Sequence, residues 1–452
     1  MNQATFISGV RCLGSRTCLK VKNPAAVLLV LILSLAMSLM LWYAMPAFID
    51  GINNHLFGGE QLYMPAWMHE LQQMFFSIYV FGSLFPFMFF TGLSMLPERQ
   101  KALDPRLPFV SVIIPAFNEE SNIAQCIESV LRLDYPAYEV IIVDDGSRDL
   151  TLPIIENYDV SLIRLRHNRG KVAALNKGIE KAKGEIVFFT DSDSALDPMA
   201  LRYLVGNFSD PSIAAVASNV VLKRNDSYLK RMQTLEYLYG QAVMKEAQIR
   251  SGDSVSICPG PATAFRRSVL LETGGYSNRT LAEDFDITVD LLELGYKAVY
   301  EPRAISSTTA MTSWKALKKQ RIRWSRGHLQ VYREHHESLF TGTTGTISMF
   351  WLPYSLFIGY GSAFLEMFFL AIYPVIVLLS PMPLTFLKLG LAYIVVMEAV
   401  NALQGIVPLI QTGRLTPSLV LSSFLTQPYR VFLSYTRILA FRDEMQHRKH
   451  VW

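Results

Sequence analysis

Two aspartates that follow an apolar run of the chain have the type and spacing of a site for a hard metal ion. Asp191 and Asp193 are separated by Ser192, so both carboxylates can converge on one Mg²⁺ or Mn²⁺. Such a cation would neutralise a diphosphate and stabilise the charge that grows on it when its bond to a sugar breaks. The alternative is that Asp193 or Ser194 caps a helix that runs on from Pro198.

A second acidic pair, Glu283 and Asp284, stands at the head of a predicted helix that contains the apolar stretch Ile287–Leu292. Either carboxylate could act as a general base for an attacking hydroxyl, provided that it lies within hydrogen-bond reach of that oxygen. In the alternative, both groups simply interact with the dipole of the helix, which contributes at most about 1 kcal/mol.

Two more candidates follow predicted strands. Asp145 lies in the run Val143–Ser147, where Gly146 permits a tight turn next to a ligand, although the same sequence also suits a plain β-turn. Lys171 follows the next predicted strand at the start of a helix. It could contact a phosphate there, and the alternative is an ordinary solvated lysine.

A cationic segment with an indole, Lys318–Arg326, precedes the last apolar part of the chain. Arg323 can bind a phosphate through two hydrogen bonds, and Trp324 offers an apolar surface for a sugar ring. The alternative is an interfacial helix whose lysines hold anionic lipid. That alternative leaves Gln320 and Trp324 unexplained.

Short β-rich runs alternate with amphipathic segments between residues 97 and 340, which is typical of an α/β domain. Successive βαβ units predict a mostly parallel sheet with ligands beyond the carboxyl ends of its strands. The predicted strands cover residues 109–115, 139–144, 161–166 and 185–190, and the first predicted helices cover 119–133 and 171–182.

Two apolar runs near the amino terminus, 24–43 and 74–96, are each close to the length that a helix needs to cross a bilayer. Four basic residues precede the first run, whereas 44–73 contains no lysine or arginine. The distribution of positive charge therefore predicts a cytoplasmic segment 1–23, an extracytoplasmic loop 44–73, and a cytoplasmic α/β domain.

The carboxyl-terminal region 341–440 contains the apolar stretches 347–379 and 384–410, which predict a helical pair. The segment 415–440 carries Gln, Pro and Arg and is interpreted as interfacial or partly embedded, followed by a cytoplasmic tail 441–452. We expect four to six spans in total.

The composition agrees with a membrane protein, since 51% of the 452 residues are apolar and 18% are charged. A net charge of +4, without a long cationic stripe, argues against nucleic acid as a partner. The four cysteines lack metal-site spacing, which fits a reduced domain that faces the cytosol.

Read in order, five motifs of this chain resemble those of the processive family-two glycosyltransferases, the synthases of cellulose, chitin, hyaluronan and poly-N-acetylglucosamine. The arrangement of two spans, a catalytic domain and further spans is most similar to that of the bacterial poly-β-1,6-N-acetylglucosamine synthases. The motifs are Val110–Glu120, Val143–Ser147, Asp191–Asp193, Glu283–Asp284 and Gln320–Trp324.

The resemblance implies an α/β fold of the Rossmann-like GT-A type inserted between transmembrane helices. It implies inverting polymerisation of a UDP-sugar, with UDP-N-acetylglucosamine as the best candidate, into a β-linked exopolysaccharide that leaves through the spans. Asp284 would be the catalytic base, Asp191 and Asp193 would hold Mg²⁺ or Mn²⁺, and Glu283 and Trp324 would bind the acceptor. The nucleotide sugar would contact Pro115, Asn118, Glu119, Asp145, Lys171, Asp191, Ser192, Gln320 and Arg323.

The same resemblance implies a multi-pass protein of the cell (inner or plasma) membrane, whose partners are the donor, the growing polysaccharide, the bilayer and, in some members, a small accessory subunit. Two positions depart from the family pattern: Ala282 stands where Thr is frequent, and Cys258–Pro261 is unusually rich in proline. The alternatives are a non-processive transferase that moves one sugar to a lipid phosphate and, outside the enzymes, a nucleotide-sensing transporter.

Overall fold

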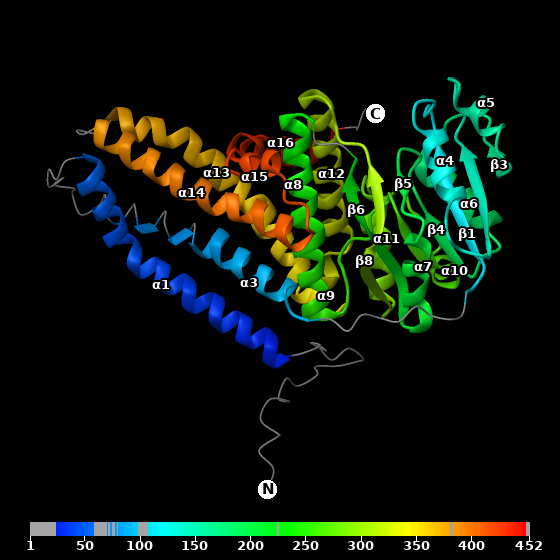
Figure 1. Ribbon diagram of the computed structural model, residues 1–452, viewed down its shortest axis with the longest axis horizontal. Coiled ribbons are helices and arrows are strands. Elements are labelled where there is room, and N and C mark those ends of the chain that lie inside the picture. Colours follow the sequence, from blue (N-terminus) through cyan, green and yellow to red (C-terminus); the bar gives the residue numbers. More distant parts are fainter. Residues whose placement is uncertain are drawn as a thin grey trace, which may run out of the picture.

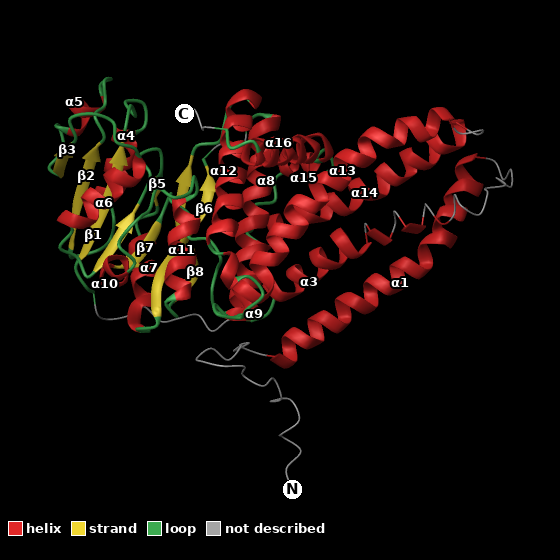
Figure 2. Ribbon diagram, turned by 180° about the vertical axis from the view of Figure 1, so that it is seen from behind, coloured by secondary structure: helices red, strands yellow, loops and turns green. Residues whose placement is uncertain are grey.

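The computed structural model consists of an α/β domain joined side by side to a group of long apolar helices (Figure 1). Figure 2 shows the same arrangement from behind, with the strands gathered at the end of the molecule away from the apolar helices. The predicted segment 1–23 and the greater part of the predicted loop after residue 57 lie outside the described residues. The structure describes residues 24–57, 70, 73–74, 77–78, 80–97, 107–223, 226–379 and 383–448.

An eight-stranded sheet forms the α/β domain, in the order β3-β2-β1-β4-β7-β6-β8-β5. Strands β1 to β4 are parallel to one another and agree with the four predicted strands to within two residues at each end. Their bounds are β1 Val110–Ala116, β2 Tyr138–Asp144, β3 Ser161–Arg164 and β4 Ile186–Phe189.

The second half of the sheet is mixed, so the prediction of a mostly parallel sheet is wrong beyond β4. Strand β7 runs antiparallel to both β4 and β6, β6 is parallel to β8, and β5 is antiparallel to β8. An antiparallel strand can enter the sheet without a right-handed crossover helix, which is why the βαβ pattern did not reveal it. The bounds are β5 Ala195–Leu196, β6 Ile213–Leu222, β7 Thr263–Arg266 and β8 Lys297–Thr308.

Helices cover the sheet and bury an aliphatic and aromatic core that includes Ile113, Ile114, Phe188 and Phe265. The close approach of helix α6 to β1 depends on Gly178, where a Cβ atom would lie 2.5 Å from Ile113 Cγ2. The helices of this domain are α4 Ile123–Leu131, α5 Thr151–Ile155, α6 Lys171–Lys181, α7 Ala200–Val205, η2 Gly206–Ser209, α8 Tyr228–Leu238, η3 Tyr239–Lys245, α9 Glu246–Gly252, α10 Arg267–Glu272, α11 Glu283–Glu293, α12 Trp314–Glu334 and η4 His336–Ser338.

The apolar helices are α1 Pro24–Phe57, η1 Val80–Leu84, α3 Phe85–Ser94, η5 Ile347–Trp351, α13 Leu352–Leu379 and α14 Pro383–Gln411. Among the described residues, two helices are long and apolar enough to cross a membrane, Pro24–Ala44 and Ile347–Leu379. Helix α1 continues through residues that the sequence had placed in a loop, and the described part of the second predicted span is the shorter apolar helix Val80–Ser94.

The segment predicted to be interfacial consists of two helices, α15 Pro417–Ser423 and α16 Gln427–Met445. Helix α16 packs against both α12 of the α/β domain and α13 of the apolar group. Arg326 of α12 is buried and donates hydrogen bonds to the Glu444 carboxylate at 3.1 Å and to the Arg448 carbonyl at 2.6 Å. This contact joins the α/β domain to the end of the described chain.

Candidate functional site

A lysine at the start of α6 meets two carboxylates, one that follows β4 and one at the start of α11. Lys171 Nζ lies 2.7 Å from Asp191 Oδ1 and 3.5 Å from Glu283 Oε1. Burial of the ammonium opposes its charge, but Asp191 and Glu283 outweigh that effect, so the pKa of Lys171 is raised. The two acidic motifs that the sequence singled out therefore meet through one cation.

The carboxylate of Asp284 faces a loop that comes from before β7. Its Oδ2 accepts a hydrogen bond from the backbone N–H of Gly260 at 3.2 Å, and a Cβ atom at Gly260 would lie 2.9 Å from Lys171 Nζ. Thr288 strengthens this link, because its hydroxyl donates to the Asp284 carbonyl and accepts from the Cys258 N–H. The proline-rich loop thus lies between the proposed base and the proposed metal ligand.

Asp193 is held by hydroxyl groups at the end of β8. Thr308 Oγ1 lies 3.2 Å from both carboxylate oxygens, and Thr309 Oγ1 lies 3.1 Å from Oδ2. Burial, followed by the charge of Asp191, raises the pKa of Asp193. Burial also raises the pKa of Glu119, as do the charges of Asp193 and Asp191.

These carboxylates therefore repel one another at a place where a cation would relieve the repulsion. The donor set is entirely oxygen, which suits Mg²⁺ or Mn²⁺. These residues therefore fit a divalent ion in ligand type and in charge, because they offer oxygen ligands and an excess of negative charge. The neighbouring Ser192 is buried and lies between the two aspartates in the chain.

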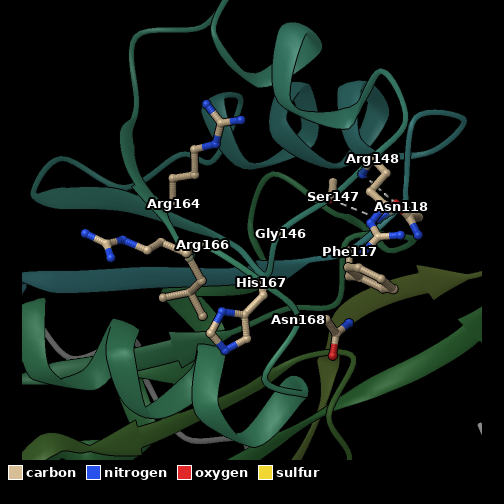
Figure 3. Close-up of a pocket in the computed structure, with 10 residues that line it drawn as sticks. Phe117, Asn118, Gly146, Ser147, Arg148, Arg164, Arg166, His167 and Asn168 are labelled. Carbon is tan, nitrogen blue, oxygen red and sulfur yellow. Dashed lines mark hydrogen bonds between the residues drawn. The ribbon is translucent and has the colours of Figure 1, made fainter.

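A pocket of about 560 Å³ lies beyond the ends of β1, β2 and β3. Figure 3 shows Phe117, Asn118 and Arg148 at one side of it and Arg164 and Arg166 at another. Asn118 adopts a positive φ of 54°, its N–H donates to Ser147 Oγ, and its Oδ1 accepts from the Arg148 N–H. Pro115 lies within the buried strand β1 just before this pocket.

Asp145 holds the loop that follows the pocket residues His167 and Asn168. Its two carboxylate oxygens each accept a backbone hydrogen bond of 2.8 Å, from the N–H groups of Arg169 and Gly170. Gly146 has φ +77°, and a Cβ atom there would lie 2.9 Å from backbone atoms of His167. The loop that leads to Lys171 is thus fixed against the end of β2.

Helix α12 carries the predicted cationic motif, and its members have different surroundings. Arg323 Nη1 donates to the Leu281 carbonyl at 3.2 Å, and its charge acts on Glu283. Arg321 is buried, pairs with Glu236 at 2.8 Å and lies 4.2 Å from the centre of the Trp324 ring. Gln320 Oε1 accepts a hydrogen bond from Arg321.

Several polar residues of the site region were not predicted from the sequence. Thr308 is the last residue of β8, a strand that the sequence did not predict, and Thr309 follows it; the pocket cations Arg148, Arg164 and Arg166 were not predicted either. The alternation of arginines at 164 and 166, at and just beyond the end of β3, is a signal that could have identified Arg164 and Arg166.

A second polar cluster runs along α11 from Asp286 in its first turn to Glu293 at its end. His335 is 3.0 Å from Glu293 Oε1 and 3.1 Å from Asp286 Oδ1, and Arg279 pairs with both Asp286 and Asp290 at 2.8 and 2.6 Å. Asp290, Glu293 and His335 have metal-ligand types within reach of one another. Because Arg279 and His335 already neutralise these carboxylates, the cluster is best described as an ion-pair network that ties α11 to the end of α12.

Comparisons with known proteins agree with the motifs. Residues 111–274 match the family model described as Glycosyl transferase family 2. The chain is 32% identical over 268 residues to the poly-beta-1,6-N-acetyl-D-glucosamine synthase of Staphylococcus epidermidis, covering 57% of this chain and 64% of that protein. The synthase of the same name from Staphylococcus aureus is 32% identical over 265 residues. The matched region thus spans slightly less than two thirds of the length of these relatives.

Among solved structures, a mannosyltransferase from Pyrobaculum calidifontis in complex with GDP-Man and Mn²⁺ superposes with a TM-score of 0.62. The alignment covers 82% of this chain and 97% of that one, at 19% sequence identity. A likeness at this level of identity shows a shared fold.

Proposed function

Because residues 111–274 are a glycosyl transferase family 2 domain and the sheet is that of the GT-A fold, we propose that this protein is a processive inverting glycosyltransferase of a cell membrane. It polymerises a UDP-sugar, with UDP-N-acetylglucosamine as the proposed donor, into a β-linked polysaccharide. The names of the staphylococcal relatives support this choice of sugar and product.

The observation that carries the proposal is the position of Lys171 between Asp191 and Glu283, with Asp284 next in the chain. A donor diphosphate bound at Asp191 and a hydroxyl activated at Asp284 would then share one cavity. Such proximity is what a direct transfer between the two requires.

In this proposal Asp191 and Asp193 hold Mg²⁺ or Mn²⁺, which supplies charge neutralisation of the donor diphosphate. Thr308 and Thr309 fix the carboxylate of Asp193, and Lys171 adds a second positive charge near the leaving group. The pocket bordered by Asn118 takes the nucleoside, with Glu119, Ser192 and Pro115 around it, and Asp145 holds the loop that forms its wall.

Asp284 accepts the proton of the acceptor hydroxyl as that oxygen attacks the sugar. One displacement inverts the anomeric carbon, so an α-linked donor gives a β-linked product. Glu283 and Trp324 contact the acceptor, and Gln320 and Arg323 contact the diphosphate. The hydrogen bond from Gly260 keeps the Asp284 carboxylate in place before the acceptor arrives.

We further propose that α1, α3, α13 and α14 cross the membrane, that the α/β domain is cytoplasmic, and that the polymer leaves between the helices. The two long apolar helices support this topology. The partners are the UDP-sugar, the polysaccharide and the bilayer, with a small accessory subunit as a further candidate.

Incubation of the full chain in detergent with labelled UDP-sugars and Mn²⁺ tests the proposal. Long polymer supports it, whereas lipid-linked monosaccharide would identify a non-processive transferase. Absence of turnover with every UDP-sugar, in protein that still binds UDP, would favour a nucleotide-sensing transporter. Linkage analysis of the product identifies the sugar and the bond.

A further inference from the structure

Lys223, the residue that follows β6, makes hydrogen bonds beside the proposed metal ligands but has no part in the proposed reaction. Its Nζ atom donates to the backbone carbonyl of Asp193 at 3.0 Å and to Oε1 of Gln125 in α4 at 3.0 Å. None of the five sequence motifs contains this lysine. The ammonium therefore joins the short segment between β4 and β5 to helix α4 through two hydrogen bonds.

The backbone of Lys223 is itself fixed to the strand end that holds the Asp193 carboxylate. Its N–H donates to the Thr308 carbonyl at 3.0 Å, where β6 and β8 run parallel. Thr308 Oγ1 lies 3.2 Å from both carboxylate oxygens of Asp193. The two residues thus hold the same aspartate at two places, Thr308 at the carboxylate and Lys223 at the backbone carbonyl.

Helix α4 also holds the backbone of the other proposed metal ligand. Cys126, next to Gln125 in the chain, is buried, and its thiol donates to the Asp191 carbonyl with a distance of 3.5 Å from Sγ to oxygen. The backbone of the proposed metal-binding segment is therefore anchored to α4 at both aspartates. The anchor is direct at Asp191 and passes through Lys223 at Asp193.

The position of a carboxylate decides how tightly it holds a cation, because Mg²⁺ requires a near-ideal octahedral arrangement of its ligands. Residues that orient metal ligands without touching the ion contribute about 10- to 100-fold to metal affinity. The charge of Lys223 acts in the opposite direction, since an ammonium beside a cation site repels the cation. Lys223 can therefore favour metal binding only by holding Asp193 in place.

We propose that Lys223 is a positioning residue of the transferase, which holds the backbone of Asp193 so that its carboxylate faces the proposed divalent ion. The inference rests on the proposed function, because it assigns a role to Lys223 through a proposed metal ligand. In this role the ammonium contacts neither the sugar nor the diphosphate. Its bonds to Asp193 and Gln125 keep the segment between β4 and β5 fixed to α4.

The test measures Mn²⁺ binding to the full chain in detergent with saturating UDP, from the electron paramagnetic resonance signal of the free ion. Lys223→Met is compared with Lys223→Arg, which keeps a charge and several donors, and with Lys177→Met as the matched control. Lys177 is partly buried like Lys223 and also binds a side chain, Glu180 at 2.6 Å, but this partner belongs to its own helix. We expect Mn²⁺ binding about tenfold weaker in Lys223→Met and native Mn²⁺ affinity in the other two variants.

The sign of the change separates position from charge. Loss of a positive charge alone would strengthen Mn²⁺ binding, whereas loss of the anchor weakens it. A Mn²⁺ affinity of Lys223→Met that equals or exceeds the native one would therefore overturn the inference. An equal loss of UDP affinity in the presence of EDTA would also overturn it, because it would indicate that Lys223 contacts the nucleotide directly.

Gln125→Leu provides a second check, because Gln125 is exposed on α4 and its replacement should not disturb the core. The variant removes one of the two hydrogen bonds of the ammonium, so Mn²⁺ binding should weaken, but less than in Lys223→Met. In the double variant the loss should equal that of Lys223→Met alone, since Gln125 acts only through the lysine. Unchanged Mn²⁺ affinity in Gln125→Leu, or additive losses in the double variant, would refute the inference.

Turnover distinguishes this inference from the proposed function. Lys223→Met should need about tenfold more Mn²⁺ for half-maximal polymer formation, with kcat at saturating Mn²⁺ close to native. A native protein that binds Mn²⁺ with UDP but makes no polymer would refute the proposed function, and the Mn²⁺ affinities would still decide the role of Lys223. Polymer formation with equal Mn²⁺ affinities in the native protein and Lys223→Met would refute only the inference. Absence of Mn²⁺ binding to the native protein would refute both.

Discussion

Lys171 Nζ and Asp191 Oδ1 form an ion pair of 2.7 Å at the end of β4. The lysine comes from the first turn of α6 and the aspartate from the strand end next to it in space, 20 residues later in the chain. A metal–diphosphate that binds Asp191 must share this carboxylate with Lys171 or displace it. If the proposed donor binds at Asp191, its binding therefore acts directly on this ion pair.

Asp191→Asn should weaken metal-dependent UDP binding, because the amide keeps the shape of the side chain but loses the charge that a cation requires. We expect a loss of more than about tenfold, since even outer residues of metal sites contribute that much. Calorimetric titration of UDP with and without Mn²⁺ measures it, with the exposed Glu180→Gln of α6 as control. An unchanged affinity for UDP would indicate that the motif Asp191–Asp193 has a structural, helix-capping role instead.

Asp284→Asn should leave UDP affinity nearly native and abolish polymer formation. The substitution removes the proton acceptor, and an amide can still accept the hydrogen bond from Gly260. We expect turnover to fall by about 10²- to 10⁴-fold, the usual contribution of general base catalysis. Normal turnover in this variant would exclude Asp284 as the base.

The network around His335 predicts a pH-dependent stability. Burial opposes the imidazolium, but Asp286 and Glu293 accept its hydrogen bonds and raise the pKa of His335 to about 9. A raised folded-state pKa contributes stability that is complete below the unfolded value near 6.5 and is lost as the pH rises through about 9. Thermal unfolding at pH 6 and pH 9.5 should therefore show a loss in the native protein of at most roughly 3 kcal/mol.

His335→Gln is the control for this stability. It should unfold at a lower temperature than the native protein at pH 6, and its own stability should vary less over the same interval. Parallel pH dependence in the two proteins would assign the loss to other groups.

Gly146→Ala should lower stability by about 1–3 kcal/mol, because the backbone at this position is left-handed and the added Cβ meets the His167 backbone at 2.9 Å. Gly274→Ala separates these two causes, since Gly274 has φ +80° but open space around its Cβ direction. We expect Gly146→Ala to be the more destabilising and to weaken UDP binding, which Gly274→Ala should preserve. Equal effects of the two variants would mean that the contact with His167 is unimportant.

The parts of the fold that could be predicted from the sequence are those with strong local signals. Strands β1, β2 and β4 are apolar runs with polar residues at or soon after their ends, and α11 has acidic residues in its first turn followed by apolar ones. Strand β8 was missed because polar residues interrupt its apolar ones over Lys297–Thr308, and β7 has four residues. Neither pattern stands out from a loop.

The sequence predicted which residues belong to the candidate site more readily than it predicted which of these residues contact one another. Lys171 and Glu283 are 112 positions apart, and their meeting depends on how the mixed half of the sheet carries α11 to the end of β4. Arg321 illustrates the same point, because it lies within the recognised motif, had no predicted site role, and has its guanidinium buried against Glu236. A motif identifies residues, whereas the three-dimensional packing decides which of them face a ligand.

The attachment of α12 on two sides has a mechanical consequence. Arg321 holds this helix to α8, and Arg326 holds it to the last turn of α16, which itself rests on α13. A sliding or tilting of α13 would therefore be transmitted through α16 to α12, the helix that carries Arg323, whose charge acts on Glu283. In the proposed membrane topology, the thickness or tension of the lipid around α13 would then act on this side of the proposed site without any ligand binding to the helices.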